Sequence, residues 1–179
     1  MANPVNVPPV KLVAPILYVA ENVLEQTKHS LEKAFSAIDY TSKAYPFAFE
    51  HYYEPEMGSP IYRIILSFTE LVDSSTLADI KLKTNEVEQQ FAVNGKRAVN
   101  IDSGYLDFDK LVLASMKKNG QKIYMGKGVW ADMNLMYAKG HFSGFPWTFP
   151  DFADNTYEKD LLLIREKYKR QLFLQRKVK

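Results

Sequence analysis

The chain has 179 residues, of which 46% are hydrophobic and 13% aromatic, enough for one domain with a substantial core. It contains no cysteine, which excludes disulfides, thiolate metal sites and cysteine nucleophiles and fits a cytoplasmic protein. No apolar run approaches the ~18 residues that a membrane-spanning helix needs, so we expect no membrane partner.

The net charge of +2 is unevenly distributed along the chain. Residues 155–179 carry eight Lys and Arg against three Asp and Glu, whereas the rest of the chain is slightly acidic. We interpret the basic segment as the solvated face of a helix with a basic tail. Nucleic-acid binding is the alternative, but we do not expect it.

Residues 1–9 predict a flexible lead-in, and hydrophobic periodicity predicts alternating strands and helices from there to residue 106. The expected elements are a strand at 11–19, a helix with apolar residues from Leu24 to Ile38, a weaker strand at 39–47, a strand at 61–71, a helix from Leu77 to Phe91 and a strand at 97–105. Apolar residues occupy both faces of the first and third strands, as in buried strands.

This βαββαβ order predicts an α+β fold with a ferredoxin-like core over residues 10–106. The two most apolar strands, Leu12–Val19 and Ile61–Phe68, are expected to lie adjacent and parallel at the centre of one sheet. A second arrangement with the same order of elements remains open.

The pattern changes after residue 106, and residues 107–154 predict a β extension to the same single domain, which spans residues 10–179. Its main element is a β-hairpin from Lys122 to Tyr137 that turns at Gly126-Lys127-Gly128. Residues 155–179 predict a closing amphipathic helix packed through Leu161, Ile164 and Tyr168.

Aromatic residues are concentrated between Lys139 and Phe152, in a segment braced by two prolines. The ring-bearing residues are His141, Phe142, Phe145, Trp147, Phe149 and Phe152. We interpret the segment as a clasp that seals one edge of the core. In such a clasp, Asp151 would accept backbone N–H bonds in the turn or cap the last helix. Stacking of Trp147 on a base or sugar is the alternative.

Most of the chain resembles an uncharacterised family of bacterial and archaeal proteins of about this length with a PWTYPDY-like signature. The similar segments include VKLVAPILY at 10–18, YYEPEMG at 52–58, YRIILSF at 62–68, KRAVNIDSGYL at 96–106 and FPWTFPDF at 145–152. This chain has Phe149 and Phe152 where the family has tyrosine, and Ser103 where it has proline. The resemblance implies a domain of unknown function and, since the family has no assigned catalytic residues, transfers none.

Two polar clusters stand out as candidate sites. The loop 49–60 concentrates His51, Tyr52, Tyr53, Glu54 and Glu56, a composition that suits a ligand or a divalent cation but also an exposed loop pinned by its tyrosines. The segment from Asp102 to Lys110 holds three acidic residues around Gly104, with a spacing that matches no metal-binding loop. Neither cluster establishes a metal site, and we predict none.

We therefore expect a cytoplasmic domain that binds a polar, phosphate-bearing, nucleotide-like small molecule, with hydrolase or transferase activity left open and the cofactor unknown. The anionic group would contact Arg63, Lys110 or Lys127. The full set of candidate residues is His51, Tyr52, Tyr53, Glu54, Glu56, Arg63, Asp102, Tyr105, Lys110, Lys127, His141, Trp147 and Asp151. The alternative is a non-catalytic module for protein interaction or homodimerisation.

Overall fold

A computed structural model describes residues 3 and 5–177 and shows a mixed α+β chain, the class that the sequence predicts. Residues 1, 2 and 4 of the predicted lead-in lie outside the described part. The strands are β1 (Val10–Tyr18), β2 (Ile38–Thr41), β3 (Tyr45–Pro46), β4 (Tyr62–Val72), β5 (Val99–Ile101), β6 (Gly104–Leu106), β7 (Lys110–Ser115), β8 (Ile123–Gly126), β9 (Val129–Ala138) and β10 (His141–Gly144). The helices are α1 (Glu21–Ala34), α2 (Glu54–Met57), α3 (Leu77–Gln90), α4 (Pro150–Ala153) and α5 (Glu158–Lys177), with short 3₁₀ helices η1 (Glu50–Tyr52) and η2 (Ser74–Thr76).

The ten strands form one antiparallel sheet in the order β10-β9-β7-β6-β1-β4-β2, with β3, β5 and β8 paired to β4, β1 and β9. β1 and β4 are adjacent, as predicted, but the prediction that they are parallel is wrong. α1 is a crossover from β1 to β2, and a crossover returns the chain parallel to the strand it left. β4 lies between β1 and β2 and is antiparallel to both.

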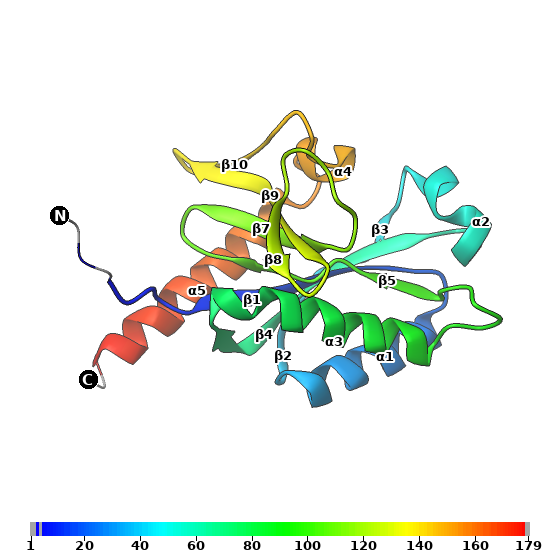
Figure 1. The fold of residues 1–179 in the computed structure, drawn as a ribbon, viewed down its shortest axis with the longest axis horizontal. Coiled ribbons are helices and arrows are strands. Elements are labelled where there is room, and N and C mark those ends of the chain that lie inside the picture. Colours follow the sequence, from blue (N-terminus) through cyan, green and yellow to red (C-terminus); the bar gives the residue numbers. More distant parts are fainter. Residues whose placement is uncertain (1–2, 4, 178–179) are drawn as a thin grey trace.

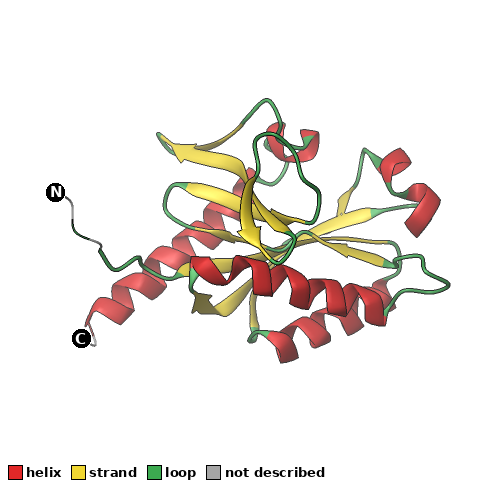
Figure 2. Ribbon diagram, in the orientation of Figure 1, coloured by secondary structure: helices red, strands yellow, loops and turns green. Residues whose placement is uncertain are grey.

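Helices cover both faces of the central strands (Figures 1 and 2). α1 and α3 pack on the face that carries Ile16 and Leu66. α5 packs on the opposite face, where Val13 and Ile65 contact the helix's apolar stripe. That stripe is buried at Leu161, Ile164 and Tyr168, so the predicted packing of the closing helix is confirmed.

The predicted strand 97–105 is interrupted at Asp102-Ser103, which divides it into β5 and β6. β1 pairs with β6 along its first half and with β5 along its second half. β6 goes on to pair with β7, but β5 pairs with β1 alone. The sheet therefore forks between β5 and β7.

Gly104 makes the close pairing of β6 with β7 possible. A Cβ atom at this position would lie 2.1 Å from the carbonyl oxygen of Val112 on β7, closer than any side chain tolerates. The glycine therefore permits close approach of two strands, one of the uses for which proteins select this residue.

Candidate functional site

A cleft of about 830 Å³ opens at the fork of the sheet. Segments that are distant in the sequence form its walls: η1, β4, α3 from Lys81 onward, β5, the end of β7, the β7–β8 loop, β9 and the Pro-aromatic segment. The break between β5 and β6 creates this opening, because β7 diverges from β5 at that point.

Five of the candidate residues line this one cleft: Tyr52, Tyr53, Arg63, Asp102 and Trp147. The expectation that Trp147, the tyrosines of the 49–60 loop and Asp102 surround one cleft thus agrees with the geometry. Asp151 lies directly behind the cleft, paired with Arg63.

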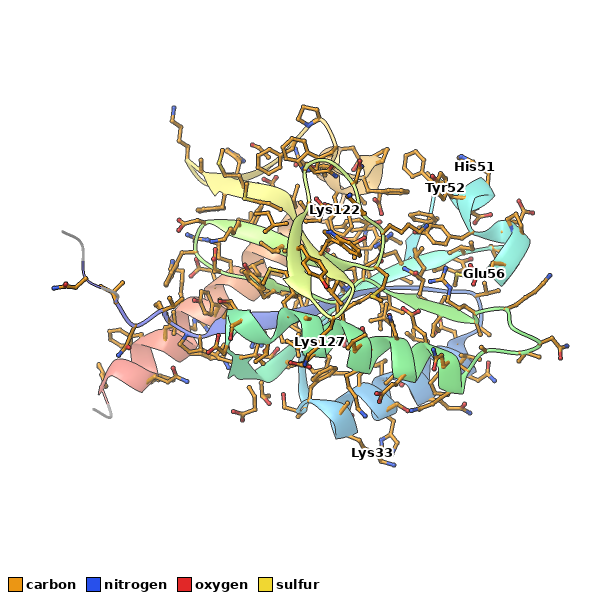
Figure 3. The ribbon with its side chains drawn as sticks, viewed as in Figure 1. Lys33, His51, Tyr52, Glu56, Lys122 and Lys127 are labelled. Atoms are coloured by element: carbon orange, nitrogen blue, oxygen red, sulfur yellow. The ribbon has the colours of Figure 1, made fainter. Side chains whose placement is uncertain are left out.

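The other candidates do not line the cleft, and most have structural partners. Four of them form ion pairs: Glu56 with Arg97, Lys110 with Asp107, Lys127 with Asp79 and His141 with Glu158. Tyr105 packs in the apolar cluster around Val112. His51 on η1 and Glu54 on α2 are exposed. Figure 3 shows Lys127 well away from Tyr52 and Glu56. The predicted anion contacts at Lys110 and Lys127 therefore do not belong to this cleft, because both lysines reach an acid elsewhere.

Arg63 is the most deeply buried charge of the cleft, with 2% of its surface exposed. Its Nη1 donates to Asp102 Oδ2 at 3.0 Å, and its Nε lies 2.9 Å from Asp151 Oδ2 as an ion pair without hydrogen-bond geometry. The guanidinium also lies over the rings of Phe47 and Phe152. Burial alone would lower the pKa of Arg63, but the two carboxylates outweigh it, so the arginine stays charged.

Asp151 completes this buried group from α4. Its Oδ2 accepts a hydrogen bond of 2.7 Å from the Tyr157 hydroxyl. Burial raises the pKa of Asp151, while Arg63 and Tyr157 act in the opposite direction. The group connects β4 to α4 and to the start of α5. Arg63 therefore stabilises the fold and also lines the cleft.

Arg97 organises a second network at the mouth of the cleft. It binds Glu56 through two hydrogen bonds of 2.7 Å and donates a third, of 2.6 Å, to Asn100 Oδ1. Asn100 Nδ2 in turn donates to Asp102 Oδ1 at 2.9 Å. This chain of bonds fixes α2 against β5 and orients the carboxylate of Asp102.

Side chains of α3 satisfy the open edge of β5. Lys81 Nζ donates to the carbonyl oxygen of Ile101 at 2.8 Å, and Glu88 accepts from the Ile101 amide at 2.6 Å. The two charged groups lie 3.7 Å apart, and burial raises the pKa of Glu88. They replace the neighbouring strand that β5 lacks, since buried backbone groups need partners.

Sequence reasoning missed the polar wall that β9 contributes. Asp132 and Asn134 are buried there, and Lys122 lies 3.4 Å from Asp132 Oδ2 while donating to Ser115 Oγ at 2.9 Å. The only signal in the sequence was two polar residues on one face of an otherwise apolar strand. That signal usually marks a solvent-facing side, and only the fork of the sheet turns it inward.

The Pro-aromatic segment forms the rim of the cleft and also seals the core. Phe149 stacks on Phe47 with ring centroids 6.0 Å apart, as a clasp would. Trp147 is 41% exposed, lies parallel to Phe145 at 4.9 Å and donates from Nε1 to the carbonyl oxygen of Met133. Its ring is therefore held by these two contacts, and part of its surface is exposed at the rim of the cleft.

Tyr53 continues this rim on the other side. Burial, reinforced by the charge of Asp102, raises its pKa to about 12, so the phenol stays protonated and remains a hydrogen-bond donor at neutral pH. Tyr52, its neighbour, is 67% exposed.

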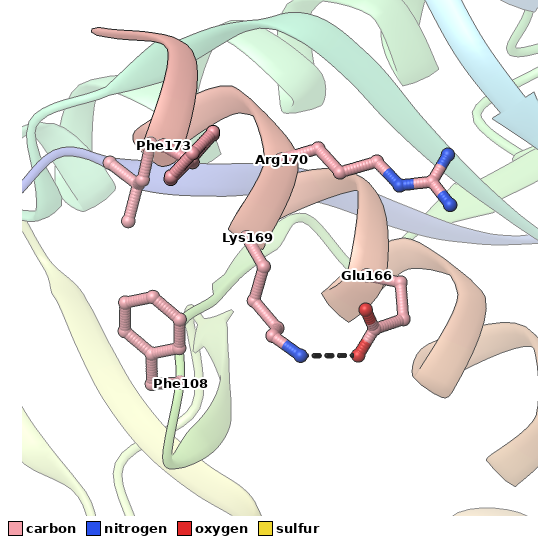
Figure 4. A pocket seen from close by; sticks show the side chains of 6 residues that line it. Phe108, Glu166, Lys169, Arg170 and Phe173 are labelled. Atoms are coloured by element: carbon pink, nitrogen blue, oxygen red, sulfur yellow. Dashed lines mark hydrogen bonds and ion pairs between the residues drawn. The ribbon is translucent and has the colours of Figure 1, made fainter. Parts of the chain in front are cut away.

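A second, smaller hollow of about 370 Å³ lies on α5 beside Phe108 (Figure 4). Its polar side chains are partly engaged with one another, since Lys169 pairs with Glu166 at 2.8 Å. None of the candidate residues lines this hollow, so the cleft at the fork is the better candidate site.

Among the described residues, no group of three or more His, Asp or Glu side chains is placed to hold a metal ion. No helix in the described part of the chain is long and apolar enough to cross a membrane.

Fold and cleft together define an α+β protein with a polar cleft at a forked antiparallel sheet. The chain belongs to the family described as a domain of unknown function (DUF4416), which matches residues 8–168. No curated protein and no solved structure matches it.

Proposed function

We propose that this protein binds a polar small molecule of nucleotide type, with a flat ring and an anionic group, in the cleft at the fork. The convergence of exposed rings and buried polar groups from distant segments on one cleft carries this proposal. Pockets that combine apolar walls with a few placed polar groups are the usual ligand sites.

The rim supports the ring of such a ligand. Trp147 is held by its hydrogen bond to Met133 and by Phe145, so stacking on it requires little further ordering. A stacked base contributes about 1–3 kcal/mol. Tyr52 offers a second exposed ring at the same cleft.

The β7–β8 loop supports the anionic group. Lys117 and Lys122 line the cleft, and Lys117 has no ion pair among the described residues. Arg63, expected to contact the anion, is neutralised by two carboxylates and is less suited to the task. Lys117 is therefore the cation best placed to contact the anionic group, because Lys122 pairs with Asp132.

The fold supports a ferredoxin-like origin for the first half of the chain. Within the sheet, β6 and β5 with β1, β4 and β2 follow the strand order 4-1-3-2, with α1 and α3 on one face. We infer that residues 10–106 are a ferredoxin-like unit extended by β7 to β10. A cytoplasmic location is part of the same proposal, supported by the absence of cysteine.

Tryptophan fluorescence tests the proposal directly. The chain has two tryptophans, so the Trp130→Phe variant leaves Trp147 as the sole reporter. We expect saturable quenching by ribonucleoside monophosphates and a weaker response to inorganic phosphate. The absence of any saturable quenching and of any rise in melting temperature with these probes would contradict the proposal.

A pair of lysine variants locates the site. Lys117→Ala removes a cation that lines the cleft, so the affinity for the monophosphates should fall about tenfold, the loss expected for one charge-assisted hydrogen bond. Lys127→Ala removes a cation that pairs with Asp79 outside the cleft and should leave the affinity unchanged. Equal effects of the two variants would place binding elsewhere.

A further inference from the structure

Asp132 and Asn134 on β9 lie in the wall of the cleft, and each has an acceptor oxygen without a partner among the described residues. Both residues line the cleft and are buried, with 9% and 6% of their surface exposed. The Oδ1 atom of each accepts no hydrogen bond from any described residue. Native proteins leave few buried polar atoms unsatisfied, so this pair requires an explanation.

The fold does not supply that explanation. Asn100 occupies a comparable place on β5 in the same cleft, and its side chain is bonded at both ends, to Arg97 and to Asp102. β9 could likewise have carried apolar residues at 132 and 134, as it does at Val129 and Leu135. The two acceptors are therefore unnecessary for folding, which is typical of groups kept for a ligand.

The aromatic segment is anchored to the same stretch of β9. Trp147 Nε1 donates to the carbonyl oxygen of Met133 at 3.1 Å, and Thr148 Oγ1 donates to that of Asn134. A ligand stacked on Trp147 therefore lies next to Asp132 and Asn134. Lys122 lies on the other side of Asp132, with its Nζ 3.4 Å from Oδ2.

We propose that Asp132 and Asn134 form an acceptor subsite for sugar hydroxyl groups, so that the ligand of the cleft carries a ribose-like ring with vicinal hydroxyls. Carboxylate and amide oxygens both accept from hydroxyls. Lys122 already compensates Asp132 and would repel a cationic donor, so a neutral hydroxyl fits better than an ammonium group. Both Oδ1 atoms are closed to solvent in the free chain, so binding turns the side chains toward the ligand.

This inference rests on the proposed function, and paired probes test it. Adenosine monophosphate should bind the Trp130→Phe protein at least about tenfold more tightly than its 2′,3′-dideoxy analogue, since two hydrogen bonds separate them. In Asp132→Ala and Asn134→Ala, each added to this background, the acceptor oxygen is removed, so the ratio should fall below about threefold while binding persists through the ring and the phosphate. Equal affinity for the two probes in the parent protein, or a ratio unchanged in both variants, would overturn the subsite.

A stability measurement needs no ligand and separates the two proposals. Asn134→Ala should leave the melting temperature unchanged or raise it, because the lost oxygen has no partner. Asn100→Ala, the matched control, should lower it, because it breaks two bonds to charged groups. If Asn134→Ala lowers the melting temperature as much as Asn100→Ala does, an ordered water satisfies the oxygen and the subsite is wrong. If the stabilities behave as expected but no probe binds, the proposed function fails instead.

Discussion

At the scale of single residues, Arg63 shows how one side chain serves both the core and the cleft. It pairs with both Asp102 and Asp151 and lies over two aromatic rings. A lysine would be a poor replacement, because its single ammonium cannot bridge two carboxylates and stack at the same time.

Replacing Arg63 by methionine should therefore destabilise the protein severely. The substitution leaves a buried carboxylate at Asp151 without its cation, a change that typically costs about 3–5 kcal/mol. Urea unfolding at neutral pH measures the loss. Lys33→Met, at an exposed position near the end of α1, is the control and should change stability by less than about 0.5 kcal/mol. A small effect of Arg63→Met would show that the buried pair is dispensable.

The pair of Arg97 and Glu56 predicts a dependence of stability on pH. The hydrogen bonds from Arg97 lower the pKa of Glu56 below its usual value of 4.5. The resulting stabilisation is complete above that usual value and is lost as the pH falls through the lowered pKa. Because 36% of the Glu56 side chain is exposed, the contribution should not exceed about 1 kcal/mol.

Glu56→Gln should accordingly reduce the drop in melting temperature between about pH 5 and about pH 3. Thermal melts of the variant and the parent protein at these two pH values measure the difference. Glu54→Gln changes an exposed glutamate of the same helix and should leave the drop as it is. If Glu56→Gln has the same pH dependence as the parent, the ion pair does not contribute in solution.

At the scale of elements, α5 shows that packing rather than charge decides how a basic segment is used. Its apolar stripe covers β1 and β4, and the cation of Arg165 lies 3.6 Å from the centre of the Tyr137 ring. Most of its other basic side chains face solvent, as the sequence predicts.

Neighbouring positions on α5 provide a matched test of this packing. Ile164 is fully buried, so Ile164→Ala should cost about 2–5 kcal/mol. Leu163 is 46% exposed, so Leu163→Ala should change stability by less than about 0.5 kcal/mol. Chemical denaturation of both variants compares them. Similar losses would mean that the helix docks through a different face.

At the scale of the whole molecule, the sheet depends on layers that come from opposite ends of the chain. Val13 and Ile65 belong to the first half, but Leu161 and Ile164 of the last helix cover them. β6 likewise needs β7 as its second neighbour. The ferredoxin-like unit inferred for residues 10–106 therefore exposes an apolar face when isolated.

A chain that ends at residue 106 should not fold by itself. We expect no cooperative thermal transition by circular dichroism and no protected amides in β1, because half of its cover is missing. A chain that ends at Leu172 keeps the buried part of α5 and should melt close to the full-length protein. A cooperative melt of the shorter fragment would show that the first half is an independent domain.

The sequence alone determined the longest helices and strands and the α+β class. Apolar runs at β1 and β4 and the stripe of α5 bury surface in any fold that the chain could adopt, so their periodicity is readable without neighbours. For the site, sequence reasoning selected Tyr52, Tyr53, Asp102 and Trp147 because their residue types exceed what a loop or strand needs. It selected Arg63 as a cation for the anionic group. Lys110, Lys127 and His141 looked equally suitable, since the local sequence does not indicate which partner a charged side chain will contact in the fold.

Only the tertiary structure decided where the sheet opens and which polar residues face the opening. The break at Asp102-Ser103, the antiparallel pairing of β1 with β4 and the inward turn of Asp132 and Asn134 depend on contacts between segments far apart in the chain. Local propensity does not predict such contacts, because the free energy that selects them comes from burial and pairing between segments. The cleft is therefore a property of the fork, and the fork exists only once β5, β7 and β9 are assembled around β1.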